Sequence, residues 1–321
     1  MDVLTDALEA IHVKGLLSGR LELTAPWGIA KAPKSPGFFV VTRGTCWFEM
    51  DGLDAPVQIG GGDLVLLPHG LAHSLRDSLT TPLKSADEVF ARFPQRKNCQ
   101  PGGVFAFGGG GALTTIVGGK IEFEDGLANP LMRSLPPMIH IRGDRGTPQP
   151  WLDTCLQFIA TEMSSGQPGA STIVSRLADI LFVQAIRAYA AEKGAEAKGW
   201  LRAISDPQIG RALSMIHEHP GAPWSVESLA AEVAMSRSAF SARFSELVEE
   251  PPLTYLTRWR MQRASKLLRA SDDTIATVAS KVGYDAEAAF SKAFKRWMGS
   301  APGSFRKGAS MGGGQTAIAN G

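Results

Sequence analysis

Two stretches near the C-terminal end of the sequence place polar and basic side chains at the spacing of one helix face. Arginine and lysine can bond guanine, glutamate can accept a hydrogen bond from the amino group of cytosine, and serine accepts several bases. These residue types are therefore suited to hydrogen bonding with base edges in a DNA groove. The first stretch supplies Arg237, Ser238, Ser241 and Ala242, with Ser236 directly before them as a further DNA contact, and the second supplies Glu287, Ala288, Ser291 and Lys292.

Further cations around these stretches are suited to the DNA backbone. Lysine and arginine neutralise phosphates and hold a protein on the duplex without reading its sequence. Arg237 fits either a guanine or a phosphate contact, so both roles stay open for it. The remaining residues are predicted to contact phosphate or to carry solvated charge: Arg243, Arg258, Arg260, Lys295, Arg296 and Arg306.

Each stretch must be carried by a helix, and the sequence supplies one for each. Both are preceded by a short apolar helix and a tight turn, and Ser236 and Asp285 are favourable N-cap residues for the helices that follow. The two N-caps lie 49 residues apart and are joined by a helical run at 254–269. The pattern predicts two helix-turn-helix units on one bridging helix, which would place two recognition helices about 34 Å apart, one turn of DNA.

Residues 224–306 resemble the DNA-binding domain of the AraC/XylS family of bacterial transcription regulators. The matching residues are Ser228, Leu229, Ala230, Met235, Ser236, Arg237, Phe240, Phe244, Tyr255, Arg258, Arg260, Ala264, Leu267, Leu268, Ile275, Ala279, Val282, Gly283, Tyr284, Phe290, Ala293, Phe294, Lys295, Gly299, Pro302 and Arg306. The family pattern is not kept everywhere, because Ala234 stands where a glycine is common and 248–252 replaces a Gly-x-Ser-Pro stretch. The carboxylates of Glu249 and Glu250 would repel phosphate, so we expect them to face solvent.

The resemblance implies a transcription regulator that has double-stranded DNA as its partner. It also implies a homodimer, contact with RNA polymerase and an activating role. No catalytic signature accompanies the motifs, and the glycines at 108–111 lack the following helix that a dinucleotide site requires. We therefore predict a regulator that is not an enzyme and that needs no cofactor.

The composition fits a protein of this class. With 321 residues, 44% hydrophobic and 20% charged, the chain has the length for two soluble domains. The sequence shows no membrane-spanning run and no signal-peptide pattern, and its three cysteines are widely spaced, which together predict a cytoplasmic protein without membrane contact. The net charge is +2, but residues 255–308 hold eleven Lys/Arg against four Asp/Glu, so the remainder is acidic by five. This asymmetry is typical of a DNA reader joined to a separate sensing module.

The N-terminal part of the sequence has a different pattern. Residues 21–141 alternate short β-rich runs with Gly/Pro-rich turns, which predicts an antiparallel sandwich or barrel. Within it, 57–73 and 136–140 resemble the cupin-type sensor that precedes this DNA-binding domain in many family members. We expect this barrel to bind a small-molecule effector through Phe39, Val41, Trp47, Phe48, Val65, Leu67, His69 and His73.

Together these patterns predict a multidomain α+β protein. Residues 1–198 are a cupin-like antiparallel β-barrel for effector sensing and dimerisation, with a helix over 1–20 and a helical hairpin over 150–193. A linker is expected at 191–206. By resemblance the hairpin is the dimerisation element, and the alternative is that it covers the open end of the barrel. The other two regions are an all-α domain with two helix-turn-helix units at 199–308 and a disordered tail at 309–321.

Two alternatives for the sensor rest on single residues. Cys99 follows two basic residues, and because nearby positive charge favours the reactive thiolate, it is a candidate oxidant sensor. An inert thiol is the alternative. His69 and His73 raise the hypothesis of a cupin-type metalloenzyme fused to a DNA-binding tail, but the His-x-His ligand pattern is missing, so we predict no metal site. Cys46 and Cys155 are expected in the core.

Overall fold

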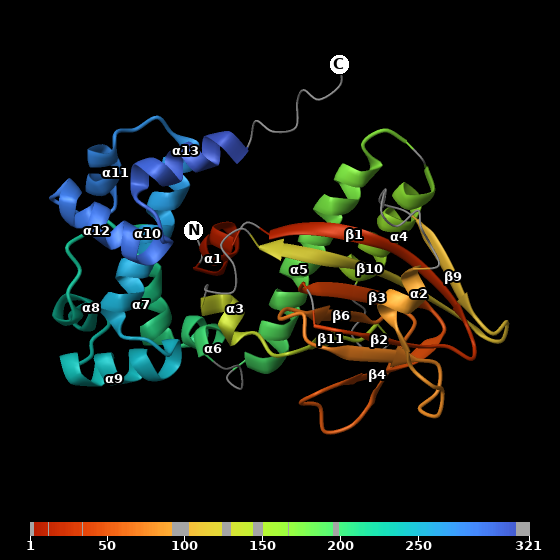
Figure 1. Ribbon diagram of the computed structural model, residues 1–321. Helices are drawn as coiled ribbons and strands as arrows, with labels where there is room; N and C mark the ends of the chain where they lie inside the picture. The colour runs from red at the N-terminus through yellow and green to blue at the C-terminus, as the bar shows by residue number, and fades with distance from the viewer. Residues whose placement is uncertain are drawn as a thin grey trace, which may run out of the picture. The chain divides into compact units, whose positions relative to one another are not determined.

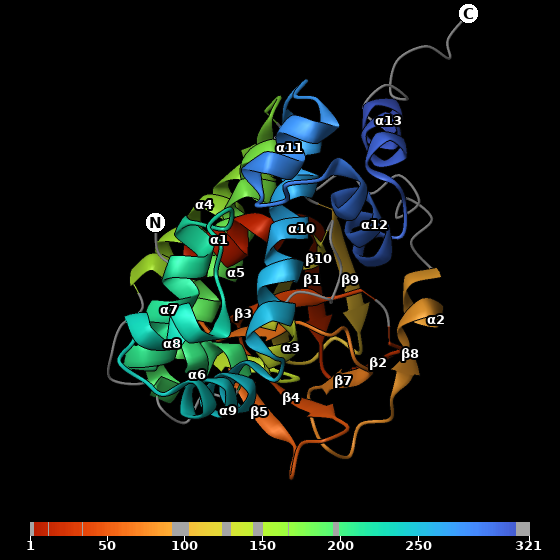
Figure 2. The same ribbon diagram turned by 90° about the vertical axis from the view of Figure 1, so that its left-hand side faces the viewer.

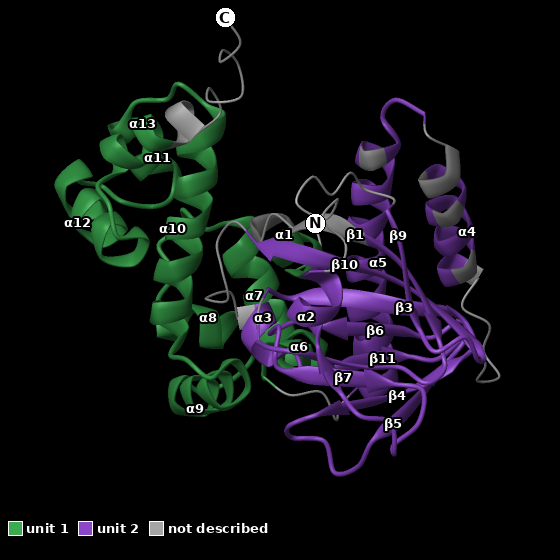
Figure 3. Cartoon of the chain, turned by 45° about the vertical axis from the view of Figure 1, so that its right-hand side comes forward, with its two compact units in different colours: residues 1–10, 195–321 green, residues 11–194 purple. Residues whose placement is uncertain are grey.

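A computed structural model of the protein describes residues 3–11, 13–33, 35–91, 103–123, 130–143, 150–165, 167–194 and 199–312. The chain divides into two compact units, one formed by Ile11–Gly194 and the other by Met1–Ala10 together with Ala195–Gly321 (Figure 3). The first ten residues therefore cluster with the helical unit, whereas the sequence had placed them in the first domain. Within the described residues, no helix is both long and apolar enough to cross a membrane.

The larger unit, which we call the β unit, is built from two sheets. The six-stranded sheet has the order β11-β6-β3-β10-β1-β9, and the five-stranded sheet has the order β5-β4-β7-β2-β8 (Figure 1). Pairing is antiparallel except between β1 and β9 and between β2 and β8. The strands are β1 Val13–Thr24, β2 Gly28–Lys31, β3 Gly37–Arg43, β4 Thr45–Met50, β5 Val57–Gly60, β6 Leu64–Leu67, β7 His73–Arg76, β8 Lys84–Ser85, β9 Val104–Gly108, β10 Leu113–Phe123 and β11 Ile139–Ile141.

The core of the β unit lies between the two sheets. Successive side chains of a strand point to opposite faces, and β4 shows this alternation, since Cys46, Phe48 and Met50 are buried while the residues between them are half-buried. In the facing sheet, Phe39 of β3 is paired with Val65 of β6. These side chains join one apolar cluster, and the prediction of a cupin-like β domain is confirmed.

A buried carboxylate joins the two stretches that resemble a cupin. Asp63, just before β6, accepts hydrogen bonds from the backbone N–H groups of Gly60 and Gly143, both at 2.9 Å. Its other contact is with Nε2 of His140 on β11, at 3.0 Å. Burial opposes the ionised form, but these hydrogen bonds outweigh it, so the pKa of Asp63 lies below its usual value. The carboxylate therefore fixes the edge strand β11 against β6.

In the described part of the β unit, four helices accompany the sheets: α2 Ala86–Ala91, α3 Pro130–Ser134, α4 Pro150–Ser165 and α5 Ala170–Lys193. The long helix α5 packs against β1, and α4 packs against α5, so the predicted helical hairpin is present. It leaves the apolar side chains of Phe158, Ile173 and Ile180 exposed. Unpartnered apolar surface on a helix pair is the feature expected of a protein–protein contact.

The start of the β unit differs from the sequence prediction. A helix was expected over 1–20, but α1 covers only Val3–Ile11 and the strand β1 already begins at Val13. Gly19 falls inside β1 at an irregularity of the register, with φ of +141°. A Cβ there would lie 2.7 Å from the carbonyl oxygen of Gly103, so the glycine permits close approach of β9 instead of ending a helix.

The second unit, which we call the helical unit, contains nine of the described helices: α1, α6 Gly199–Ser205, α7 Pro207–Glu218, α8 Val226–Glu232, α9 Arg237–Val248, α10 Pro252–Ala270, α11 Ile275–Lys281, α12 Glu287–Met298 and α13 Pro302–Gly312. Two predictions at its ends are corrected. The expected linker at 191–206 contains α6, because Trp200 and Leu201 are apolar and become buried. The expected tail from 309 begins with the last turn of α13, and 313–321 lie outside the described residues.

Two helix-turn-helix units, α8–α9 and α11–α12, lie at the two ends of α10 (Figure 1, Figure 2). The 19 residues of α10 correspond to a helix about 28 Å long. Each unit has its own aromatic core, with ring centroids 5.6 Å apart for Phe240 and Phe244 and 5.5 Å apart for Phe290 and Phe294. The predicted pair of units on one bridging helix is therefore confirmed.

The second helix-turn-helix, α11–α12, has a longer turn than the first, α8–α9. The first helices begin after the N-caps Ser225 and Thr274, which are 49 residues apart, whereas α9 and α12 begin after Ser236 and Ala286, which are 50 apart. Ser236 accepts a hydrogen bond from the backbone of Ala239, as predicted for an N-cap. Asp285 was predicted to cap α12, but the extra residue moves the N-cap to Ala286, which makes no side-chain cap.

Candidate nucleic-acid interface

Of the four base contacts predicted on the recognition helix α9, Arg237 is the charged one, and it forms an ion pair. Arg237, Ser238 and Ala242 are exposed and Ser241 is half-buried. The Arg237 side chain is 71% exposed and its Nε lies 2.8 Å from an oxygen of Glu227 on α8. An exposed ion pair of this kind contributes little to stability, because water screens it. Arg237 can therefore leave Glu227 for a base or a phosphate at small cost.

The recognition helix α12 presents a more basic face. With the offset of 50 residues, Glu287, Ala288, Ser291 and Lys292 occupy the positions that Arg237, Ser238, Ser241 and Ala242 occupy on α9. The cations Lys292, Lys295 and Arg296 are all exposed on this helix. Electrostatic attraction of phosphates should therefore be stronger at α12 than at α9.

The structure gives Arg258 a different role from the one the sequence suggested. Its side chain is 8% exposed, and its Nε donates to Glu250 at 3.2 Å, while Glu250 is itself 11% exposed. The guanidinium also lies 4.8 Å from the ring centre of Tyr255. Such burial does not fit a phosphate contact, and the expectation that Glu250 faces solvent is corrected with it. The pair instead fixes the start of α10, since Glu250 lies two residues before this helix.

Arg260 ties the two helix-turn-helix units together. Its Nε donates to the carbonyl of Pro220 at 2.7 Å and its Nη2 donates to that of Ala222 at 2.8 Å, both in the loop before α8. On its other side it lies over the ring of Tyr284, in the second turn. Gly283, with φ of +82°, completes this contact, because a Cβ there would meet Arg260 Nη2 at 2.7 Å. Arg260 is thus a structural link and not a free phosphate contact.

Two further predicted phosphate contacts also have partners within the helical unit. Arg243 on α9 donates to Asp206, the N-cap of α7, with Nε at 3.0 Å from Oδ2, and remains half-exposed. Arg306 on α13 donates to the carbonyl of Asp273 at 2.6 Å, just before α11. Both stabilise helix ends. Of the predicted phosphate contacts, Lys295 and Arg296 are exposed on α12, and Lys292 on the same helix and Arg237 on α9, which were predicted at the base edges, are exposed as well.

A buried polar chain in the helical unit was missed by the sequence analysis. Trp200 Nε1 donates to the hydroxyl of Tyr255 at 3.0 Å, and this hydroxyl lies 2.7 Å from Nε2 of His217. An indole N–H can only donate, so the tyrosine hydroxyl accepts from Trp200 and keeps its own proton for donation to His217 Nε2. The other ring nitrogen, Nδ1, then faces a carboxylate oxygen of Asp6 at 3.5 Å. Burial lowers the pKa of His217, and its ring stacks on Trp259 with centroids 3.6 Å apart.

Removing the hydroxyl at the centre of this chain should destabilise the helical unit. In Tyr255→Phe, Trp200 Nε1 and His217 Nε2 both lose their buried partner, which costs about 1–3 kcal/mol. Urea denaturation of the full chain should show a lower midpoint. Tyr284→Phe, where the hydroxyl is only half-buried, should change the midpoint much less. Equal midpoints for the wild type and Tyr255→Phe would contradict the polar chain.

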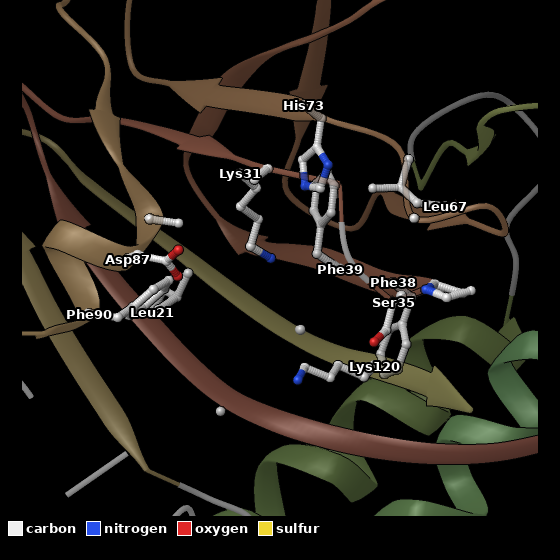
Figure 4. Close-up of a pocket in the computed structure, with 18 of the residues that line it drawn as sticks. Leu21, Lys31, Ser35, Phe38, Phe39, Leu67, His73, Asp87, Phe90 and Lys120 are labelled. Atoms are coloured by element: carbon white, nitrogen blue, oxygen red, sulfur yellow. The ribbon is translucent and has the colours of Figure 1, made fainter. Parts of the chain in front are cut away.

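The β unit contains a cavity of about 170 Å³ between its two sheets. Three of the eight predicted effector contacts line it, namely Phe39, Leu67 and His73 (Figure 4). His73 Nδ1 lies 2.9 Å from the carbonyl of Leu71, which can only accept, so Nδ1 carries the hydrogen. Burial, together with the charge of Lys31, lowers the pKa of His73 to about 4. The ring is therefore neutral at physiological pH.

The other five predicted effector contacts lie elsewhere. Val41, Phe48 and Val65 are fully buried in the core cluster and do not line the cavity. Trp47 lies on the opposite face of β4 from Phe48, as the alternation of a strand requires. His69 Nε2 contacts the carbonyl of Leu135 at 3.0 Å.

Neither single-residue alternative gains a site. Within the described residues, no three His, Cys, Asp or Glu side chains converge where a metal could be held. Cys99 lies outside the described residues. Cys46 and Cys155 are buried as predicted, and burial raises the pKa of the Cys46 thiol to about 12, which disfavours the reactive thiolate.

Two helix-turn-helix units on one bridging helix, together with a separate cupin-like β unit, define the architecture of a DNA-binding regulator. Comparison with known protein families supports this architecture for both the N-terminal and the C-terminal part of the chain. Residues 2–191 match the cupin family, and residues 229–308 match the helix-turn-helix domain family.

Relatives match over almost the whole chain. A putative AraC-like transcription regulator of Streptomyces lividans is 36% identical over 310 residues, which are 96% of this chain and 98% of its own. A second, of Streptomyces antibioticus, is 34% identical over 310 residues, 96% and 99% of the two chains. The transcriptional regulator AlkR of Acinetobacter baylyi is 35% identical over 294 residues, which are 85% of this chain and 95% of its own. The chain belongs to the AraC-like transcription regulators, which agrees with the prediction that it is not an enzyme.

Proposed function

We propose that this DNA-binding transcription regulator is controlled by a small-molecule effector that binds in the β unit. The cavity between the two sheets carries this proposal, because it combines apolar walls with a few charged groups in one place. Binding sites for small molecules have this composition. The effector would then bias the DNA-binding state of the helical unit.

A ligand screen on the full chain tests the effector. A compound that binds only the folded protein raises its melting temperature, by about 2.7 kcal/mol of stability at a hundredfold excess over its Kd. Ser35→Trp, at the edge of the cavity, is the matched variant, because its indole would occlude the site. The proposal expects a compound that stabilises the wild type but not this variant and that changes expression of a reporter. A compound that stabilises both proteins equally would place effector binding elsewhere.

The same proposal assigns the contacts with DNA. Residues on the exposed faces of α9 and α12 read bases, and the exposed cations of α12 contact phosphate. We expect the protein to activate transcription through RNA polymerase. Lower expression of a reporter gene in the presence of the protein would overturn this expectation. The exposed Phe158, Ile173 and Ile180 support a homodimer through α4 and α5.

Ser241→Ala and Ser291→Ala should each change the base preference in one half of the operator. Ser241 projects from α9 and Ser291 occupies the same position on α12, so each substitution should relax selection at a different place. Each substitution should reduce the binding free energy for the preferred base by about 0.5–1.5 kcal/mol, the usual contribution of one hydrogen bond. Selection from random DNA followed by sequencing measures it. Identical sequence preferences for the wild type and both variants would show that other residues read the bases.

A further inference from the structure

The size of the cavity in the β unit limits what can occupy it. Its volume is about 170 Å³, whereas pockets for drug-sized ligands have about 300–1,000 Å³. A cavity of about 150 Å³ in another protein holds one benzene molecule. The ligand is therefore small, with one ring or a short hydrocarbon chain plus a polar group.

Most of the wall is apolar. Leu21, Phe39, Leu67 and Phe105 line it from the six-stranded sheet, and Phe90 lines it from α2. The rings of Phe90 and Phe105 meet edge to face, with centroids 6.1 Å apart. Aromatic walls of this kind favour a flat or aliphatic body over a polyhydroxylated one, because hydroxyl groups would lose their water without gaining partners.

The charged groups reach the cavity from facing sheets. Lys31 comes from β2 of the five-stranded sheet and Lys120 from β10 of the six-stranded sheet, and both chains extend toward the space between them (Figure 4). Asp87 at the start of α2 is the acidic residue in the lining. Because His73 is neutral, two ammonium groups and one carboxylate leave a net charge of +1. One negative charge on a ligand would balance it.

We propose that the cavity binds an organic monoanion, with a carboxylate held between Lys31 and Lys120 and a single ring or short hydrocarbon body against Phe39, Leu67 and Phe90. The inference rests on the proposed function, since it names the chemical class of the effector in that same cavity. Hydrogen bonds to charged groups contribute about 1.5–3 kcal/mol. Loss of either lysine should therefore weaken binding of a carboxylate about tenfold or more.

Calorimetric titration of the full chain with matched probes tests the class of ligand. Benzoate and hexanoate are the anionic probes, and benzamide and hexanamide have the same shapes without the charge. The carboxylates should bind at least tenfold more tightly than the amides. Lys31→Gln and Lys120→Gln should each weaken the carboxylates about tenfold and leave the amides unchanged. Lys84→Gln is the matched control, because Lys84 lies on β8 beside β2 but does not line the cavity.

The outcomes separate this inference from the proposed function. Amides that bind as tightly as carboxylates, or carboxylates that keep their affinity in both lysine variants, would overturn the anionic ligand while the effector cavity stands. Failure of all four probes, with a different compound from the screen stabilising the wild type but not Ser35→Trp, would also reject the monoanion and retain the effector. If no compound in the screen stabilises the wild type more than Ser35→Trp, the effector cavity itself is rejected.

Discussion

Joint replacement of Lys292, Lys295 and Arg296 by alanine is expected to lower affinity for DNA by about 100-fold at physiological salt. Each phosphate contact contributes about 0.9 to the slope of log K against log salt, so three contacts contribute about 2.7. At 0.15 M salt this slope corresponds to roughly two orders of magnitude in affinity. All three side chains are exposed on α12, so the fold should be unaffected.

Affinity measured at several salt concentrations, on operator and on random DNA, checks this expectation. The slope should fall by about 3 on both DNAs, because phosphate contacts do not depend on sequence. A variant with Arg43, Lys84 and Arg142 replaced by alanine removes the same net charge from exposed positions of the β unit, and its slope should equal that of the wild type. If the α12 variant keeps the wild-type slope, the phosphate contacts lie on other elements.

Arg258→Met is expected to destabilise the helical unit by about 3–5 kcal/mol, which is the usual cost of removing one partner of a buried ion pair. Glu250 would keep its charge in a site where its side chain is only 11% exposed. The double variant Arg258→Met with Glu250→Gln should recover most of this loss, because no uncompensated charge remains. Urea denaturation of the full chain measures both values.

The same experiment separates the two roles considered for Arg258. If Arg258 contacts phosphate, the single variant should bind DNA more weakly at unchanged stability, and Glu250→Gln should not restore binding. If it is structural, the two substitutions should be strongly non-additive in stability. Arg243→Met is a useful comparison, because Arg243 is half-exposed and its pair with Asp206 should contribute far less.

The helical unit could be predicted closely because its signals are local. Apolar spacing and the capping serine at 236 define α8 and α9 within a few residues of sequence. The missed detail is the extra residue in the second turn, which moved the N-cap from Asp285 to Ala286. Local preference favours Asp285 as the N-cap, so we attribute the shift to packing of Phe290 and Phe294 in the second core.

The roles of the arginines and the lining of the effector cavity could be predicted only in part. In both cases the residues that come together are distant in sequence. Arg260 bonds carbonyls about 40 residues earlier, and residue type alone does not distinguish such a link from a phosphate contact. Lys31 and Lys120 line the same cavity although they come from different sheets and are far apart in the sequence. Trp47 was a different kind of error, because the alternation of a strand already placed it opposite Phe48.

The longer second turn and the different faces of α9 and α12 give the bound protein a direction. A symmetric dimer reads the same half-site twice in opposite orientations and cannot distinguish the two ends of its palindrome. Here a single chain carries Arg237 and Ser238 on one recognition helix and Glu287 and Ala288 on the other, in an order fixed by the link through Arg260. With the proposed base contacts we expect an asymmetric operator, in which one occupied site would mark the upstream side.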